Sequence, residues 1–150
     1  MIITRKDIVV ATVSILATAA VVALAQSTLK PTPSCVFDWN NLKPVITQVG
    51  ERRQVFDMPT ATLDRLECHI TTVDPGKAPH AAHRHPEEEL LIVKEGTLEV
   101  VQNDQTNRVE AGGIIFQASN ELHGLRNIST NRVTYYVVKF VPPGLLKAKP

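Results

Sequence analysis

Three histidines and three consecutive glutamates fall within one short segment, which reads HAAHRHPEEELLIVKEG from His80 to Gly96. His83 and His85 are two residues apart, so on an extended chain both imidazoles leave the same face, and Glu89 follows on that face four residues later. Imidazoles crowded beside carboxylates repel one another when protonated and lose hydration when buried. Metal ligation accounts for this mixture, because an ion is held by neutral imidazoles and carboxylates that converge on one point.

The apolar residues that follow indicate a strand. Leu91 and Val93 continue the face of the candidate ligands, whereas Leu90 and Ile92 point to the opposite face, where we expect a second layer. Gly96 permits a turn, and we expect residues 97–102 to return antiparallel to this strand.

A second group of candidate residues comes later in the chain. Gly112 and Gly113 precede an apolar stretch that includes Phe116, and His123 and Asn127 follow with the same parity. If the strand that carries His123 neighbours the first segment, His123 supplies a fourth ligand. Phe116 is a candidate for the pocket wall, although core packing explains it equally well.

Three neighbouring residues have two interpretations each. His80 has the wrong parity for a ligand, so it lies either at the pocket mouth or in solvent. Glu87 shares the parity of Glu89 and either orients a ligand imidazole or belongs to a solvated rim. His69 lies in an alternating strand without nearby ligand-type residues, and we interpret it as structural or solvated.

The rest of the chain reads as short strands separated by turn residues such as Asp74-Pro75-Gly76 and Asn103-Asp104. We expect strands at 63–73, 88–93, 97–102, 114–117, 122–127 and 132–141. No stretch after Ala25 sustains an apolar helical period for long, so the sequence predicts an all-β sandwich or barrel.

The first 25 residues have a different character. Arg5 and Lys6 precede an apolar run that ends in Ala23-Leu24-Ala25, the order of a signal peptide. The run is long enough to span a bilayer, so a retained N-terminal anchor helix is the alternative. Both predict export to a periplasmic or extracellular location, with membrane contact only if the segment is retained.

The remaining length and charge limit the function. Residues 26–35 carry prolines and polar side chains typical of a linker, and residues 36–145 suffice for one domain. Loss of Arg5, Lys6 and Asp7 on cleavage removes a net +1, so the formal net charge falls from +1 to 0. A neutral chain without a basic cluster is not expected to bind nucleic acid.

The two cysteines have two interpretations. Cys35 and Cys68 are either free thiols or form a disulfide, which the compartment of an exported chain permits.

Together these residues resemble the cupin superfamily, in particular a small single-domain cupin of the type-2 kind. Two motifs carry the resemblance. The first is matched, with one extra residue after its first glycine, by Gly76, His83, His85, Glu89 and Gly96. The second is matched at Gly112, His123 and Asn127, with Ala118 where proline is usual and Asn120 where glycine is usual.

The resemblance implies a single jelly-roll β-barrel, preceded here by the signal peptide or anchor, that holds one divalent metal through His83, His85, Glu89 and His123. Such donors suit Mn, Fe, Co, Ni, Cu or Zn and not Ca or Mg. The resemblance to cupins also implies that Asn127 supports the barrel, and it makes a homodimer plausible. The sequence itself shows no dimer interface.

The function that we expect is a metal-dependent enzyme of dioxygenase, isomerase or decarboxylase type. Its substrate is a small oxygenated or carbonyl-bearing molecule, and the sequence identifies no general base. A non-catalytic module that binds a small molecule is the alternative, and a purely structural domain without metal is a third interpretation.

Overall fold

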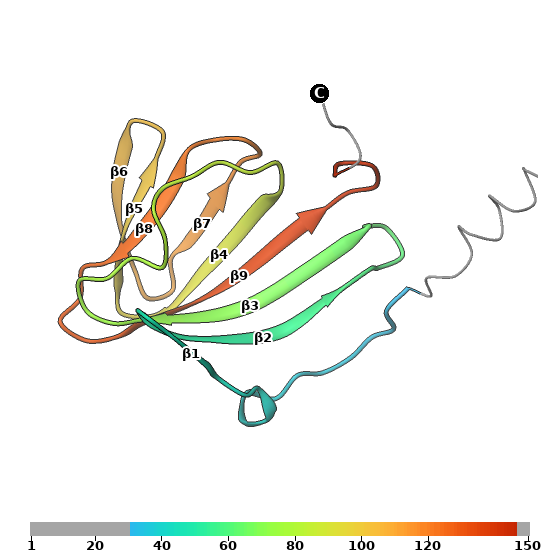
Figure 1. Ribbon diagram of the computed structural model, residues 1–150, viewed down its shortest axis with the longest axis horizontal. Coiled ribbons are helices and arrows are strands. Elements are labelled where there is room, and N and C mark those ends of the chain that lie inside the picture. The colour runs from blue at the N-terminus through green and yellow to red at the C-terminus, as the bar shows by residue number, and fades with distance from the viewer. Residues whose placement is uncertain (1–30, 147–150) are drawn as a thin grey trace, which may run out of the picture. The chain divides into compact units, whose positions relative to one another are not determined.

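The structure is a computed structural model that describes residues 31–146, and the described chain is almost entirely β (Figure 1). It contains nine strands and one short helical turn, as follows: η1 (Trp39–Asn41), β1 (Val45–Thr47), β2 (Gly50–Met58), β3 (Arg65–Val73), β4 (Glu88–Glu95), β5 (Thr97–Gln102), β6 (Gln105–Glu110), β7 (Ile114–Gln117), β8 (His123–Asn127) and β9 (Val133–Val141). The all-β prediction is confirmed.

The strands form two antiparallel sheets. The larger sheet has the order β1-β2-β3-β9-β4-β7, and the smaller has the order β6-β5-β8. In Figure 1 the smaller sheet lies beside the end of the larger one that contains β4 and β7. This is a β-sandwich of the jelly-roll kind.

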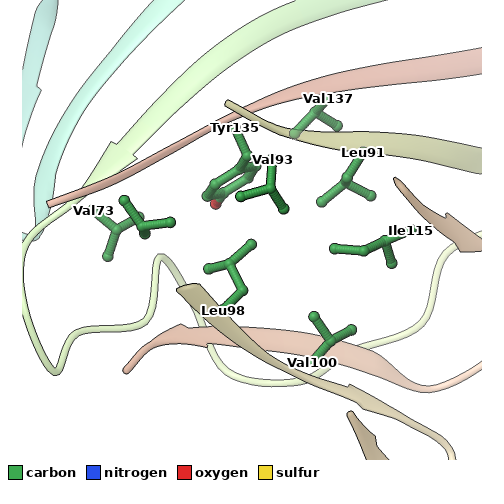
Figure 2. Packing of buried hydrophobic residues seen from close by; sticks show 9 residues of the cluster. Val73, Leu91, Val93, Leu98, Val100, Ile115, Tyr135 and Val137 are labelled. Atoms are coloured by element: carbon green, nitrogen blue, oxygen red, sulfur yellow. The ribbon is translucent and has the colours of Figure 1, made fainter. Parts of the chain in front are cut away.

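Side chains from both sheets meet in a hydrophobic core (Figure 2). Leu98 and Val100 from β5 face Leu91 and Val93 from β4, and each of the four is at most 2% exposed. Burial of each such side chain contributes about 1.5–3 kcal/mol. The face of β4 that carries Glu89 is therefore held against the small sheet, and Leu91 and Val93 share that face as the sequence predicts.

The six predicted strands are present, with ends within two residues of those expected. Three strands, β1, β2 and β6, are not predicted by the sequence pattern. Both β1 and β6 are edge strands with mostly exposed residues, and β2 carries charged side chains on both faces. A hydrophobic period cannot identify strands of this kind.

Two expectations about β4 are wrong. Strand β5 does not pair with β4, because the chain crosses at Gly96 from the large sheet to the small one, where β5 pairs with β6 and β8. Gly96 has φ of 83°, and a Cβ there would lie 2.9 Å from Val133 Cβ, so the crossing requires glycine. The outer face of β4 has no complete second layer, since Ile92 is 38% exposed.

The predictions for residues 1–25 and for most of the linker lie outside the described residues. Within residues 31–146, no helix has the length and apolar character needed to cross a membrane. Cys35 is exposed and Cys68 is buried, and both are free thiols in the structure.

Candidate metal centre

The two segments that carry the candidate histidines lie side by side. His83 and His123 form an antiparallel bridge, in which each backbone N–H donates to the other residue's carbonyl at 2.9 and 3.0 Å. The backbones approach closely here, because a Cβ on Gly124 would lie 3.0 Å from Ala82 Cα. The strand that carries His123 therefore does neighbour the segment of His83.

His83, His85 and His123 converge on one point. One nitrogen from each ring lies within 4.8 Å of the other two, a group that can hold a metal ion. Nε2 of His123 lies 3.2 Å from Nε2 of His85, and Nδ1 of His123 donates to the Glu121 carbonyl at 2.9 Å. That hydrogen bond fixes the ring with Nε2 turned toward His85.

The electrostatics also fit a metal ion. Burial lowers the pKa of His83, and the neighbouring imidazoles lower it further. Burial likewise lowers the pKa of His123. Nδ1 of His83 is buried without a hydrogen-bond partner among the described residues. Neutral imidazoles with unused nitrogens are the form that binds a transition metal.

Glu89 lies next to this cluster and is bound on its other side by a lysine. Its Oε1 is 3.1 Å from Nε2 of His85 and 2.7 Å from Nζ of Lys139, its cross-strand neighbour. Burial would raise the pKa of Glu89, but Lys139 and the nearby imidazoles outweigh it and lower that pKa. Glu89 is not one of the three mutually close residues, so its role as a fourth ligand stays a prediction.

Glu87 and His80 lie beside the histidine cluster, at the rim of the site. Glu87 Oε2 is 3.4 Å from Nδ1 of His85, but this nitrogen makes no hydrogen bond among the described residues, so Glu87 lies beside the ring without fixing it. His80 is exposed, yet its ring packs edge-on against His83 with centroids 4.4 Å apart, and it lines the cavity. His80 therefore lies at the pocket mouth.

The histidines open onto a cavity of about 390 Å³, a volume that suits a small molecule. Apolar walls come from Leu91, Leu125 and Val137, together with the ring of Tyr135. Phe116 does not line this cavity. It lies on the outer face opposite Leu90, where it is 52% exposed, because β7 turns Ile115 and Gln117 inward instead.

The far wall of the cavity carries charged residues that sequence reasoning did not connect. Arg52 and His69 both line it, and both contact Glu67, which is 3% exposed. Burial would raise the pKa of Glu67, but the hydrogen bonds from His69 and Gln54 and the charges of His69 and Arg52 lower it from 4.5 to about 2. His69 is thus paired and faces the cavity, and the spacing of two residues from Glu67 was the signal for it.

The lowered pKa of Glu67 predicts an acid-sensitive contribution to stability. The group is ionised more readily in the folded state, so its contribution is complete above pH 4.5 and is lost as pH falls toward about 2. The whole shift corresponds to ~3 kcal/mol, of which ~2 kcal/mol is lost between about pH 6 and about pH 3.

Urea unfolding of the wild type and of Glu67→Gln at these two pH values measures this contribution. The wild type is expected to lose ~2 kcal/mol more than the variant on acidification. Equal losses in both proteins would contradict the pairing of Glu67.

The described domain therefore defines a class: a small β-sandwich with a histidine cluster at the edge of an internal cavity. Residues 69–139 match the family model described as a cupin domain. Together with the fold, this match confirms the resemblance to the cupin superfamily. No curated protein sequence matches the chain.

Solved structures with the same fold include several cupins. An RmlC-like cupin from Shewanella frigidimarina has a TM-score of 0.61 at 15% identity and covers 76% of this chain and 96% of its own. The polyketide cyclase RemF from Streptomyces resistomycificus has a TM-score of 0.60 at 23% identity, with coverage of 74% and 82%. A predicted oxalate decarboxylase from Thermotoga maritima has a TM-score of 0.57 at 18% identity, with coverage of 71% and 99%. At these identities the likeness shows the fold alone.

Proposed function

We propose that this protein is a metal-dependent enzyme that acts on a small oxygenated or carbonyl-bearing molecule. The observation that carries the proposal is the convergence of His83, His85 and His123 at the edge of a cavity that contains further ionisable groups. These residues are the ligands that we assign, with Glu89 as the fourth. Bound there, a divalent transition metal would polarise a substrate oxygen as a Lewis acid or support chemistry with dioxygen.

The chain's own residues hold and shield the substrate in this proposal. Leu91, Val137 and Tyr135 supply an apolar wall against which the non-polar part of a substrate would pack. Burial raises the pKa of Tyr135, so its hydroxyl stays protonated. The Glu121 carbonyl orients His123.

Metal-dependent turnover tests the proposal. Metal-free protein and protein reloaded with Mn, Fe, Ni, Cu or Zn are incubated with candidate carbonyl and enediol compounds, and consumption is followed by proton NMR. We expect turnover only in a loaded form. Equal turnover by the metal-free and loaded proteins would contradict an enzymatic role for the metal.

The ion pair between Lys139 and Glu89 predicts an effect on metal affinity. Lys139→Met leaves the buried Glu89 carboxylate without a cation, so a metal ion gains a free anionic ligand. We expect affinity for Zn²⁺ to rise about tenfold, equivalent to ~1.4 kcal/mol. Isothermal titration calorimetry measures the change.

Lys94→Met is the matched control, because Lys94 lies 3.7 Å above the Trp39 ring and does not line the cavity. Its affinity should equal that of the wild type. An unchanged or weaker affinity in Lys139→Met would show that Glu89 is not a ligand.

We also propose that the protein is exported, on the basis of the basic and apolar order of residues 5–25. Fractionation of expressing cells and N-terminal sequencing of the recovered protein test this. Recovery of the intact chain in the cytosol would contradict it.

A further inference from the structure

The imidazole of His69, which lines the cavity outside the three-histidine cluster, is paired with the buried Glu67 carboxylate behind it. Oε1 of Glu67 lies 2.7 Å from Nδ1 of His69, and it also accepts hydrogen bonds from Arg52 Nη2 at 2.8 Å and Gln54 Nε2 at 3.1 Å. Glu67 is 3% exposed. Three donors on one buried carboxylate hold it ionised and fix its position.

This arrangement determines the tautomer of His69. An ionised carboxylate only accepts hydrogen bonds, so Nδ1 of His69 carries the proton. In the neutral ring Nε2 then has a free lone pair. Nε2 makes no hydrogen bond to any residue in the described range 31–146, and His69 lines the cavity. The ring thus presents a proton acceptor to whatever occupies the cavity.

The position of the pair relative to the three histidines suits a small substrate. His69 on β3 lies opposite Val137 on β9, and Val137 lies opposite Leu91 on β4. Two strand spacings separate the His69 and Leu91 backbones by ~10 Å. All three side chains line the same cavity as His83 and His123, so a molecule of a few carbon atoms held at the histidine cluster extends toward His69.

The local sequence explains why the pair forms. Glu67 and His69 alternate with buried Cys68 and Ile70, so both point to the cavity face of β3. A bulge between Gln54 and Phe56 interrupts the pairing of β2 with β3 beside them. The bulge leaves Gln54 Nε2 close to Glu67, where a regular ladder would continue.

We propose that His69 is the proton-transferring residue of this cavity and that Glu67 is its positioning residue, which makes the substrate a carbonyl compound with a transferable proton on the adjacent carbon. This rests on the proposed function, because the histidine cluster holds the substrate. Nε2 takes the proton, so the C–H bond breaks, an N–H bond forms and the electron pair moves onto the carbonyl oxygen. For an α-hydroxy carbonyl substrate, return of the proton to the former carbonyl carbon, with transfer of the hydroxyl proton to the former carbonyl oxygen, gives the isomer and restores neutral His69. The reaction needs no oxidant or reductant, and the Glu67 carboxylate stabilises the intermediate imidazolium.

Acylation of histidines by diethyl pyrocarbonate tests the proposal on the full-length protein. The reagent attacks an accessible, unprotonated imidazole nitrogen, and tryptic peptides separate the sites. His69 lies alone in 66–77, His85 in 85–94 and His123 in 109–126, while His80 and His83 share 78–84 and are resolved by fragmentation. Exposed His80 is the internal reference.

We expect His69 to be acylated in the native wild type and several-fold more slowly in Glu67→Gln. Glu51→Gln is the matched control, because Glu51 pairs with Arg53 and does not line the cavity. Misfolding of Glu67→Gln would expose the ring and raise the rate, so it cannot imitate the expected decrease. A wild-type His69 that stays unreactive while His80 reacts would overturn the proposal.

The tautomer of His69 provides a second test of the proposal, and this test uses the wild-type protein alone. Long-range proton–nitrogen NMR spectra of ¹⁵N-histidine-labelled protein are expected to place the proton of the neutral ring on Nδ1. A proton on Nε2 would overturn the proposal. On a substrate that the protein turns over, His69→Gln is further expected to lower kcat about 10²–10⁴-fold with metal content unchanged, and unchanged kcat would also overturn it.

The same peptide analysis distinguishes a failure of the His69 proposal from a failure of the proposed metal site. Loading with Zn²⁺ should protect His83, His85 and His123 from acylation and leave His69 reactive. Absence of protection would contradict the metal site without affecting the result for His69.

Discussion

The double variant His83→Ala/His123→Ala is expected to lose its transition metal almost completely. It removes two of the three imidazoles whose nitrogens lie within 4.8 Å of one another and leaves His85 as the only histidine of the cluster. Loss of an outer-shell partner alone lowers metal affinity 10–100-fold, so loss of two direct ligands should exceed about 100-fold. Calorimetric titration with Zn²⁺ in chelator-treated protein measures the change.

His80→Ala is the control for this variant. His80 packs against His83 but is exposed at the pocket mouth, and we do not assign it as a ligand. Its metal affinity should remain near that of the wild type. If the double variant binds Zn²⁺ as tightly as the control, the histidine cluster is not the metal site.

Asn127→Ala is expected to destabilise the fold by about 3–5 kcal/mol. Asn127 has 0% exposure, and its Nδ2 donates to the carbonyls of Val73 at 2.8 Å and Asn131 at 2.9 Å. Its Oδ1 accepts from the Ser129 backbone N–H at 2.7 Å. Alanine leaves the buried Val73 carbonyl and the partly buried Ser129 N–H and Asn131 carbonyl without this partner.

Urea unfolding measures this effect, with Asn107→Ala on the exposed strand β6 as the matched control. The control should change the free energy of unfolding by less than ~0.5 kcal/mol. A loss below ~1 kcal/mol in Asn127→Ala would show that the turn between β8 and β9 does not depend on this side chain. The supporting role expected for Asn127 agrees with its contacts.

The shared face of the residues around His83 could be predicted from the sequence, because it depends only on the spacing of residues within one segment. The shared parity of Glu89, Leu91 and Val93 is a property of one strand, and these residues do lie on its buried face. The partner of a strand is not local information. Gly96 therefore indicated a turn correctly, whereas the sheet that β5 joins after it was predicted wrongly.

The charged wall of the cavity was missed for a related reason. His69 and Glu67 are two residues apart, but their significance depends on Arg52 and Gln54, which come from β2. Strand β2 has no apolar alternation that would predict it, since its inner face is lined by polar groups. The ion pair between Lys139 and Glu89 likewise depends on the register of β9 with β4, which one sequence does not encode in any short pattern.

The metal content of the wild-type chain decides whether the histidine cluster is a metal site. The protein is purified without chelator or affinity tag and analysed by elemental mass spectrometry, before and after reloading with Mn, Fe, Co, Ni, Cu and Zn salts. We expect close to one transition-metal ion per chain. No bound metal in either preparation would contradict it and leave a cupin fold whose histidines serve another purpose.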